Sequence, residues 1–209
     1  MSRKNVVVGR RGAGKTLFCL QFAKQLGLRT VEWLIERADG RTETRQTVVD
    51  SVLRLHSNGA LQFAPGQQSL LVHATKANRR PFALTDTMGL TEDSIVSSQQ
   101  RDAIAQTLQT LLSARLILHV MDAAQMGAEV KPSHAVRRVH PLAAMDHAIF
   151  LTSQLAERYI VLANKMDLPT AEQGLITIRR ALPKAKIVPI SARSGFGFAE
   201  VERLVWKFA

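Results

Sequence analysis

A glycine-rich segment near the amino end has the residue types and spacing of a phosphate-binding loop. Gly9-Arg10-Arg11-Gly12-Ala13-Gly14-Lys15-Thr16 matches the pattern G-x-x-x-x-G-K-[ST]. Its glycines allow backbone N–H groups to converge on anionic oxygens, and the helix expected to follow adds a partial positive charge. The residues expected to contact a nucleotide here are Gly9, Gly12, Ala13, Gly14, Lys15, Thr16 and Leu17.

This pattern predicts phosphate binding only between a strand and a helix, and both flanks are present. Residues 5–8 form a β-branched run typical of a buried strand. Residues 16–26 repeat apolar side chains along one helical stripe. In this setting we expect Lys15 to bridge the β- and γ-phosphates, and the Thr16 hydroxyl to ligate Mg²⁺.

A carboxylate and a glycine follow a second predicted strand, at residues 80–85. In Asp86-Thr87-Met88-Gly89, the carboxylate is placed to hold Mg²⁺ through water, and the glycine N–H can approach a γ-phosphate closely. The expected metal ligands are Thr16 and Asp86. The expected catalytic set is Lys15, Thr16, Asp86 and Gly89.

A third loop has the residues needed to select a base. Residues 159–163 predict a buried strand that ends at Asn164-Lys165-Met166-Asp167. The Asp167 carboxylate can accept both N1–H and N2–H of guanine, a donor pair that adenine lacks. Asn164 can tie the loop to neighbouring backbone, and the aliphatic part of Lys165 can cover the base.

The strand predicted at residues 186–190 leads to a short stretch that gains meaning from the other motifs. Alone, Ser191-Ala192-Arg193 is an ordinary turn, but after the other three motifs its backbone is expected to meet guanine O6. The chain is therefore predicted to bind GTP or GDP with Mg²⁺. The expected base-binding residues are Asn164, Lys165, Asp167, Ser191, Ala192 and Arg193.

Strands alternate with helical patterns along the chain, which predicts an α/β fold of three layers. We expect a mostly parallel sheet with one antiparallel edge strand, at residues 69–75, and helices on both faces. Thr170 and Gln173 resemble a capping box, and residues 200–208 predict the last helix. The core positions expected in the helix at 94–113 are Ile104, Leu108, Leu111 and Leu112.

These motifs resemble those of a known family. The chain looks like a P-loop small GTPase with a Ras-like G domain, of the translation-factor-related class, and is similar to the Era, EngA and TrmE branch. Asp86-Thr87-Met88-Gly89-Leu90 resembles the D-T-P-G of that branch, and residues 191–201 resemble its ending S-A-x-x-G-x-G. The resemblance spans nearly the whole chain. It implies one G domain over residues 1–209 that binds GTP and GDP with Mg²⁺ and hydrolyses GTP.

Two positions depart from the family pattern. Gly12 stands where much of the Era branch has a cation-binding Asn, so potassium stimulation is not expected. Leu90 stands where Ras-like enzymes have a water-orienting Gln, and an apolar side chain cannot orient water. We therefore expect slow intrinsic hydrolysis. The positive charge needed for faster hydrolysis would come from a protein partner, which we favour, or from Arg10 or Arg11.

The segment around residues 30–68 is longer than a minimal Ras-like domain needs and should contain switch I. The sequence leaves its magnesium-binding Thr open among Thr42, Thr44 and Thr47. Ala38-Asp39-Gly40 is compatible with a hairpin turn, and residues 46–56 with a helix.

The charge balance suggests an anionic partner besides the nucleotide. The net charge is +11 and the pI is about 10.7. RNA or the ribosome would suit the resemblance, but no aromatic residues interleave with the charges, so a solvated basic surface stays equally open. Basic side chains cluster at Lys76/Arg79/Arg80, at Lys131/Arg137/Arg138/His140 and at Arg179/Arg180/Lys184/Lys186.

The sequence carries no pattern for a membrane span, a signal peptide or a lipid anchor, which predicts a cytoplasmic protein. His119 is expected to be a core histidine. Two functions from different classes remain: a GTP hydrolase acting as a switch, in RNA or ribosome assembly, and a low-turnover GTP-binding module that docks to a protein complex. Either would have a protein effector or activator as partner.

Overall fold

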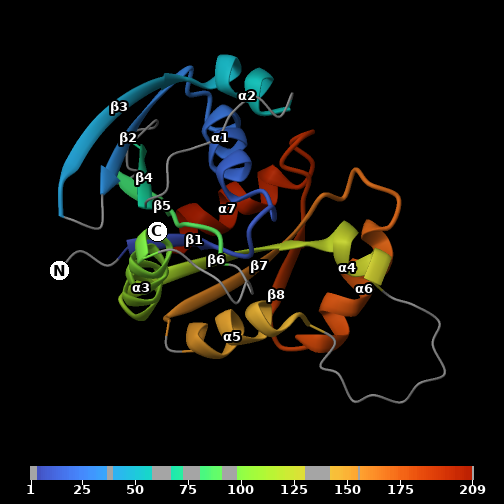
Figure 1. The fold of residues 1–209 in the computed structure, drawn as a ribbon. Coiled ribbons are helices and arrows are strands. Elements are labelled where there is room, and N and C mark those ends of the chain that lie inside the picture. Colours follow the sequence, from blue (N-terminus) through green and yellow to red (C-terminus); the bar gives the residue numbers. More distant parts are fainter. Residues whose placement is uncertain are drawn as a thin grey trace.

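The structure places all four motifs at the carboxyl edge of one sheet (Figure 1). The computed structural model describes residues 4–36, 40–57, 67–72, 81–90, 98–129, 142–154 and 156–208. Within these residues the sheet has eight strands, in the order β3-β2-β4-β5-β1-β6-β7-β8. The strands are β1 (Lys4–Val8), β2 (Thr30–Glu36), β3 (Thr42–Val48), β4 (Gln67–Val72), β5 (Phe82–Asp86), β6 (Ala114–Asp122), β7 (Arg158–Asn164) and β8 (Lys186–Pro189).

Helices cover both faces of the sheet, as the sequence predicts (Figure 1). α1 and α7 pack on one face, and α2 lies against α1. α3, α4, α5 and α6 pack on the other. The helices are α1 (Lys15–Gln25), α2 (Val49–Ser57), α3 (Ser98–Leu112), α4 (Ala123–Glu129), α5 (Ala144–Ser153), α6 (Ala171–Ala181) and α7 (Phe198–Phe208). No described helix has the length and apolar character needed to cross a bilayer.

The parallel half of the sheet arises from short apolar runs buried on both faces. β1 pairs with β5 and β6, β6 with β7, and β7 with β8, all in parallel. Val6, Val7 and Val8 are fully buried, which explains why β1 lacks alternation. Because parallel strands end at the same edge, the loops that follow β1, β5, β7 and β8 converge there.

The antiparallel half is larger than the single edge strand expected. β4 pairs antiparallel with β5, as predicted, but β2 covers its other side and β3 pairs with β2. The edge position predicted for residues 69–75 is therefore wrong, while the mostly parallel α/β fold with helices on both faces is confirmed. β2 and β3 form the hairpin that the sequence allowed, although Ala38 and Asp39 of its turn lie outside the described residues.

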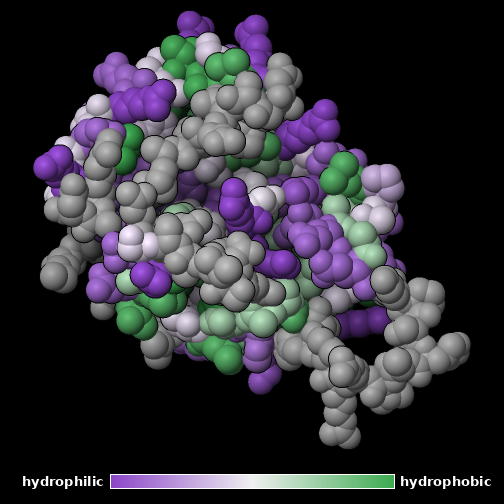
Figure 2. Space-filling model, viewed as in Figure 1, coloured by the Kyte–Doolittle hydropathy of each residue, from purple (hydrophilic) through white to green (hydrophobic). Residues whose placement is uncertain are grey.

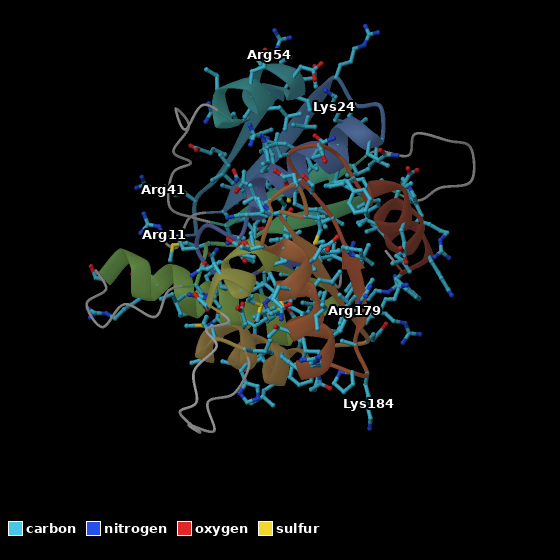
Figure 3. All side chains as sticks on the ribbon, turned by 90° about the vertical axis from the view of Figure 1, so that its right-hand side faces the viewer. Arg11, Lys24, Arg41, Arg54, Arg179 and Lys184 are labelled. Atoms are coloured by element: carbon cyan, nitrogen blue, oxygen red, sulfur yellow. The ribbon has the colours of Figure 1, made fainter. Side chains whose placement is uncertain are left out.

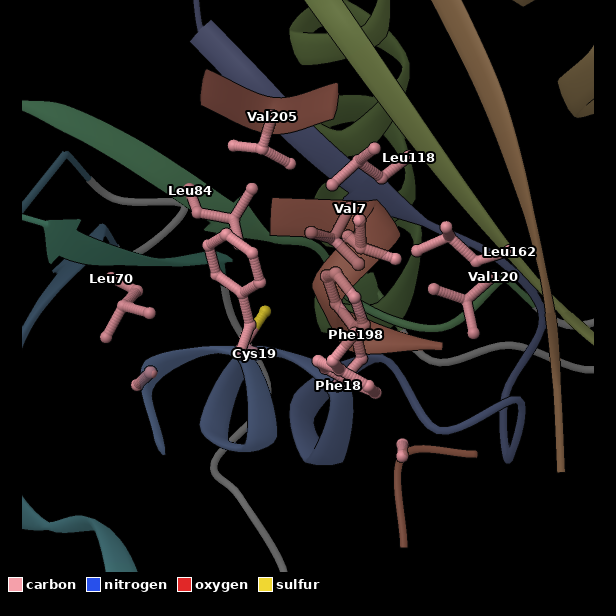
Figure 4. Packing of buried hydrophobic residues seen from close by; sticks show 14 of the residues in the cluster. Val7, Phe18, Cys19, Leu70, Leu84, Leu118, Val120, Leu162, Phe198 and Val205 are labelled. Atoms are coloured by element: carbon pink, nitrogen blue, oxygen red, sulfur yellow. The ribbon is translucent and has the colours of Figure 1, made fainter. Parts of the chain in front are cut away.

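A hydrophobic layer fixes α1 and α7 under the nucleotide-facing edge of the sheet. The ring of Phe18 in α1 packs against that of Phe198 in α7, tilted by 34°, with their centroids 5.4 Å apart. Val7, Leu84 and Leu118 come from the sheet above them (Figure 4). The start of α1, and with it the phosphate-binding loop, is thereby held rigidly against β1.

The inner face of α3 differs from the expected one. Ile104 and Leu111 face the core, but Leu108 and Leu112 are 42% and 59% exposed. The buried positions of the last turns are taken instead by threonines, and Thr110 Oγ1 donates to Gln67 Oε1 at 2.7 Å. The apolar pattern fails here because hydrogen-bonded hydroxyls can occupy core positions.

Thr170 precedes α6 but does not cap it. Its hydroxyl donates to Ala124 O at 2.8 Å, so the predicted capping box with Gln173 is wrong. This bond joins α6 to α4. The same two helices approach closely at Gly127 and Gly174, where a Cβ on Gly127 would lie 1.9 Å from Thr170 O and one on Gly174 would lie 1.8 Å from Ala123 O.

Candidate functional site

The loop between β1 and α1 has the curled backbone expected of a phosphate-binding loop. Gly9 has φ 155°, and a Cβ there would lie 2.2 Å from Val120 O of β6. Gly14 has φ 97°, and a Cβ there would lie 2.4 Å from Asn164 Nδ2. Gly12 also has positive φ. Gly9 and Gly14 combine such backbone with close neighbours, so glycine is structurally required at these two positions, whereas a Cβ on Gly12 would meet nothing within 4 Å.

Lys15 is held inside this loop. Its side chain is buried, and Nζ donates to Arg10 O at 3.0 Å. Burial lowers the pKa of the Lys15 ammonium, and the nearby Asp86 carboxylate opposes that shift. A polyphosphate would provide the ammonium with the anionic partners that stabilise its charge.

Thr16 and Asp86 meet where the metal is expected. Thr16 Oγ1 donates to Asp86 Oδ2 at 2.6 Å, although the two residues are distant in sequence. Gln68 Nε2 donates to the same oxygen at 3.0 Å. A hydroxyl and a carboxylate suit Mg²⁺, which prefers oxygen ligands and keeps several waters and phosphate oxygens. The described residues contain no group of three or more His, Cys, Asp or Glu side chains suited to another metal.

Gly89 and Leu90 lie directly on the phosphate-binding loop. A Cβ on Gly89 would be 2.7 Å from Arg11 Cα and 3.0 Å from Lys15 Nζ. Arg11 N donates to Leu90 O at 2.9 Å, and Leu90 N to Gly9 O at 3.3 Å. The Leu90 side chain is 2% exposed and packs with Val6 and Val8. Leu90 is thus a core residue.

Asn164 connects three loops through its side-chain amide. Nδ2 donates to Ala13 O at 2.8 Å, and Ala192 N donates to Oδ1 at 2.9 Å. Both bonds are buried. This is the tie to neighbouring backbone that the sequence predicts, and it sets the distance between the phosphate-binding loop and the loop that contains Ser191.

Asp167 is exposed and oriented by one contact. Ser191 Oγ donates to Asp167 Oδ1 at 2.7 Å. Met166 N donates to Ile190 O at 3.1 Å, which pairs the two loops along their backbones. Lys165 has φ 69°, the positive value that turns the chain there. Its Nζ lies 2.5 Å from Asp122 Oδ2. The Asp167 carboxylate is therefore accessible to a base and fixed in direction.

A groove adjoins these loops on the side of α1. Leu17 and Arg193, two of the predicted contact residues, line it together with side chains of α1 and α2. Lys24 of α1 and Asp50 of α2 form an ion pair of 2.9 Å at its rim. The hydrogen bond from Lys24 lowers the pKa of the Asp50 carboxyl. α2 thus forms one wall beside the proposed base-binding edge.

The sequence did not predict a network of buried polar side chains that lies under the phosphate-binding loop. His119 is fully buried, with its ring nitrogens 2.8 Å from Tyr159 Oη and 3.1 Å from Asp146 Oδ1. Asp146 Oδ2 lies 4.0 Å from Arg10 Nη1. Burial raises the pKa of the Tyr159 hydroxyl. His119 is a core histidine, as expected. No sequence pattern indicates these contacts, because Tyr159, Asp146 and Arg10 lie on three segments far from His119 in the sequence.

The three candidate switch threonines are not near Thr16. Thr42, Thr44 and Thr47 lie on β3, the outermost strand, with β2, β4 and β5 between it and β1. At about 4.8 Å per strand, β3 is roughly 19 Å from β1. In this structure none of them is positioned as a metal ligand.

Taken together, the sheet order and the three linked loops define the protein class: this is the fold of a P-loop G domain, of the type found in Era, Obg and TrmE proteins. No family model matches the chain. GTPase Obg of Desulfatibacillum aliphaticivorans is 30% identical over 122 residues, which are 58% of this chain and 34% of that protein. The tRNA modification GTPase MnmE of Chlorobium luteolum is 30% identical over 126 residues, 59% of this chain and 23% of that protein. The chain thus matches less than half the length of either relative.

Solved structures support the fold. A variant of Aquifex aeolicus Era bound to GDP and AlF4⁻ has a TM-score of 0.61 at 20% identity, covering 98% of this chain and 56% of Era. Era in complex with MgGDPNP and nucleotides 1506–1542 of 16S ribosomal RNA has a TM-score of 0.59 at 20% identity, with 99% and 56% covered. The signal recognition particle receptor complex SRb-GTP/SRX from Chaetomium thermophilum has a TM-score of 0.54 at 19% identity, with 99% and 98% covered.

Proposed function

We propose that the chain binds GTP and GDP with Mg²⁺ and hydrolyses GTP to GDP and phosphate, as a molecular switch. The observation that carries the proposal is the side chain of Asn164, which joins the phosphate-binding loop to the loop at 191–193. Asp167 is fixed beside it by Ser191. A base-selecting carboxylate and a polyphosphate-binding loop are thereby held in one site.

The base is guanine in this proposal. Asp167 accepts N1–H and N2–H, and the aliphatic part of Lys165 covers one face of the ring. Guanine O6 would meet the backbone of the 191–193 loop through the N–H of Arg193, because the Ala192 N–H already donates to Asn164 Oδ1. Adenine presents an acceptor where guanine has a donor, so it would leave the carboxylate unpaired in a partly desolvated site.

The phosphates and the metal occupy the other half of the site. Lys15 would leave Arg10 O and bind the β- and γ-phosphate oxygens, and the Thr16 hydroxyl would be a ligand of Mg²⁺. The Asp86 carboxylate, which accepts from the Thr16 hydroxyl, would help to hold the same ion. Gly89 contributes its N–H to the γ-phosphate. When bound, Mg²⁺ neutralises charge that develops on the phosphate oxygens.

Hydrolysis is slow without a partner in this proposal. Leu90 is buried among Val6 and Val8 and carries no hydrogen-bonding group, so it does not orient water. The Arg10 guanidinium lies beside Asp146, under the loop. Arg11 is exposed. We infer that a protein activator supplies the missing positive charge, which is worth several orders of magnitude in related chemistry.

An RNA or ribosomal partner fits the net charge of +11. One similar structure, Era, is in complex with 16S ribosomal RNA. Exposed cations on the described surface include Arg54 on α2, at the top of Figure 3, and Arg179 on α6, in its lower half. On the face shown in Figure 2, hydrophilic side chains predominate and hydrophobic ones form separate areas. Filter binding that detects no salt-sensitive retention of structured RNA at about 50 mM salt would contradict this partner.

The alternative is a low-turnover module that docks to a protein complex, with the same nucleotide site. The curated relatives are both named GTPases, which supports the hydrolase. We further propose that residues 1–209 form a single G domain of a cytoplasmic protein, with an elaborated switch I region at about 30–68. The hairpin of β2 and β3 and the helix α2 are the described part of that region.

Base selection is tested by substituting Asp167 with Asn. The wild-type chain is expected to bind GDP far more tightly than ADP. Asp167→Asn should lose about 2–5 kcal/mol of guanine affinity, because one charged hydrogen-bond pair is replaced by a mismatched amide. The variant should gain affinity for xanthosine diphosphate, whose N1–H and O2 edge matches that amide. Competition against a fluorescent GDP analogue measures both changes, and displacement of GDP by equimolar ATP would exclude a guanine site.

Turnover is tested at Leu90. Single-turnover hydrolysis by the chain alone is expected at about 10⁻⁴–10⁻³ s⁻¹, with little response to potassium. Leu90→Gln should not accelerate it, and should cost about 1–3 kcal/mol of stability because a polar amide enters an apolar cluster. Quenched-flow assays with Arg11→Ala as the matched variant separate the sources of charge. If the basal rate of hydrolysis is fast and falls in the Arg11→Ala protein, the positive charge comes from Arg11 and not from a protein activator.

A further inference from the structure

We propose that the outer edge of β3 pairs with the same strand of a second copy of this chain, antiparallel, so that two sheets become one. β3 is the outermost strand at one side of the sheet and curves along the outside of the molecule (Figure 1). Within the part of the chain that the structure describes, no strand lies on its outer side.

The strand is regular enough to accept a neighbour. Its pairing with β2 runs without interruption from Thr30↔Val48 to Glu36↔Thr42. Natural edge strands are commonly protected by a proline, a bulge or a short length. β3 is seven residues long and has neither proline nor bulge. Residues 42–46 are exposed, so no described segment covers this part of the strand.

Charge symmetry selects the partner and the register. A two-fold axis perpendicular to an antiparallel pair places one residue opposite its own copy. With Thr44 on that axis, Glu43 lies opposite Arg45 of the second copy, and Arg45 opposite Glu43. Each interface then gains two directly opposed pairs of opposite charge, the arrangement that stabilises neighbouring strands.

The adjacent registers are excluded by the same residues. An axis through Glu43 would oppose two glutamates and would also bring Arg41 opposite Arg45. An axis through Arg45 would oppose two arginines. Like charges directly opposite are unfavourable, so of the three registers centred on residues 43, 44 and 45 only the one centred on Thr44 opposes unlike charges. Charged residues protect an edge strand when they carry one sign, whereas this pair attracts its own copy.

The interface leaves the nucleotide site accessible. β2, β4 and β5 lie between β3 and β1, so the loops of the site remain at a distance from the axis. The contact is one strand wide, so we expect a weak dimer with a dissociation constant of about 10–100 µM. Nucleotide affinity is expected to be the same in monomer and dimer.

Sedimentation velocity of the full chain, from about 5 to 300 µM, tests the dimer. The wild type should approach twice its mass of 23.1 kDa as concentration rises. Glu43→Arg alone and Arg45→Glu alone should each stay monomeric, because each opposes like charges. An equimolar mixture of the two variants should dimerise again, since both opposed pairs are then of opposite sign. Failure of the wild type to associate at 300 µM, or of the mixture to recover association, overturns the proposal.

Cross-linking at the axis tests the register. Cys19 is the one cysteine of the chain and is fully buried, so an introduced thiol is the reactive one. Thr44→Cys should give a covalent dimer with a short bis-maleimide, because position 44 faces itself. Gln25→Cys, on α1 away from β3, is the matched control and should stay monomeric. Equal cross-linking of the two variants would show association through another surface. Unchanged melting temperatures and GDP affinity would show that the variants are folded.

Discussion

An alanine in place of Lys15 is expected to weaken binding of Mg-GTP by about 100-fold or more while leaving the fold intact. The ammonium is the one basic side chain buried inside the phosphate-binding loop. Its pKa is lowered by burial, so the charged form is destabilised in the folded protein before a phosphate arrives. In the Lys15→Ala protein the free energy gained by not burying a charge offsets the free energy lost with the hydrogen bond to Arg10 O. The free energy of unfolding should therefore change by less than about 1 kcal/mol.

Titration calorimetry in Mg²⁺, combined with urea unfolding of the nucleotide-free chain, separates the two effects. Lys207→Ala is the matched control, because it removes an exposed lysine in the last turn of α7. It should change neither quantity. Full GTP affinity in the Lys15→Ala protein would contradict the assignment of the loop, and a large loss of stability would show that the lysine is structural.

Gly174→Ala is expected to have the largest effect on stability, about 2–4 kcal/mol. The new Cβ would lie 1.8 Å from Ala123 O and 2.9 Å from Gly127 N, so α4 and α6 must separate. Alanine would favour an isolated helix by about 1 kcal/mol, which offsets only part of the cost. Because α4 begins directly after Asp122, its displacement should also disturb the contact with Lys165 and weaken GDP binding.

Urea unfolding of Gly174→Ala beside Gly27→Ala distinguishes crowding from backbone strain. A Cβ on Gly27 meets nothing within 4 Å, but its φ of 79° is unfavourable for alanine. The free energy of unfolding of the Gly27→Ala control should fall by about 1–2 kcal/mol, and its GDP affinity should stay unchanged. Similar losses in the two variants, with normal GDP binding in both, would show that the close approach of α4 and α6 is easily relaxed.

Contiguous patterns predicted the elements around the site. The loop from Gly9 to Thr16 carries both its own glycines and the apolar runs on either side, so sequence alone identifies its setting. Asp86 and Asn164 each follow a buried strand, and the parallel order of those strands brings them to one edge. Their convergence follows from the rule that ligands bind at the carboxyl ends of parallel strands.

The rest depends on contacts between distant segments. β3 is polar enough that its pairing is decided by tertiary neighbours, which is why residues 42–47 also suited a loop. On α3 the buried side chain near the end of the helix is Thr110, and Leu112, which was expected to be buried, is exposed. Thr110 can be buried because Gln67 accepts a hydrogen bond from its hydroxyl. Thr170 bonds to α4 instead of capping α6. In each case a hydrogen bond across the fold overrides a local preference.

The amide of Asn164 has a consequence for how the site meets its ligand. One end of this side chain must donate and the other must accept, since Nδ2 faces a carbonyl and Oδ1 faces an N–H. An aspartate or a leucine of similar size cannot do both. The loops that hold phosphate and base are thus set at a fixed spacing before any nucleotide arrives, and their conformational freedom is lost during folding. A guanine ring and a polyphosphate joined in one molecule should therefore bind with far greater affinity than the two fragments supplied separately. The spacing of the two loops, set by the Asn164 side chain, already matches the distance between base and phosphate.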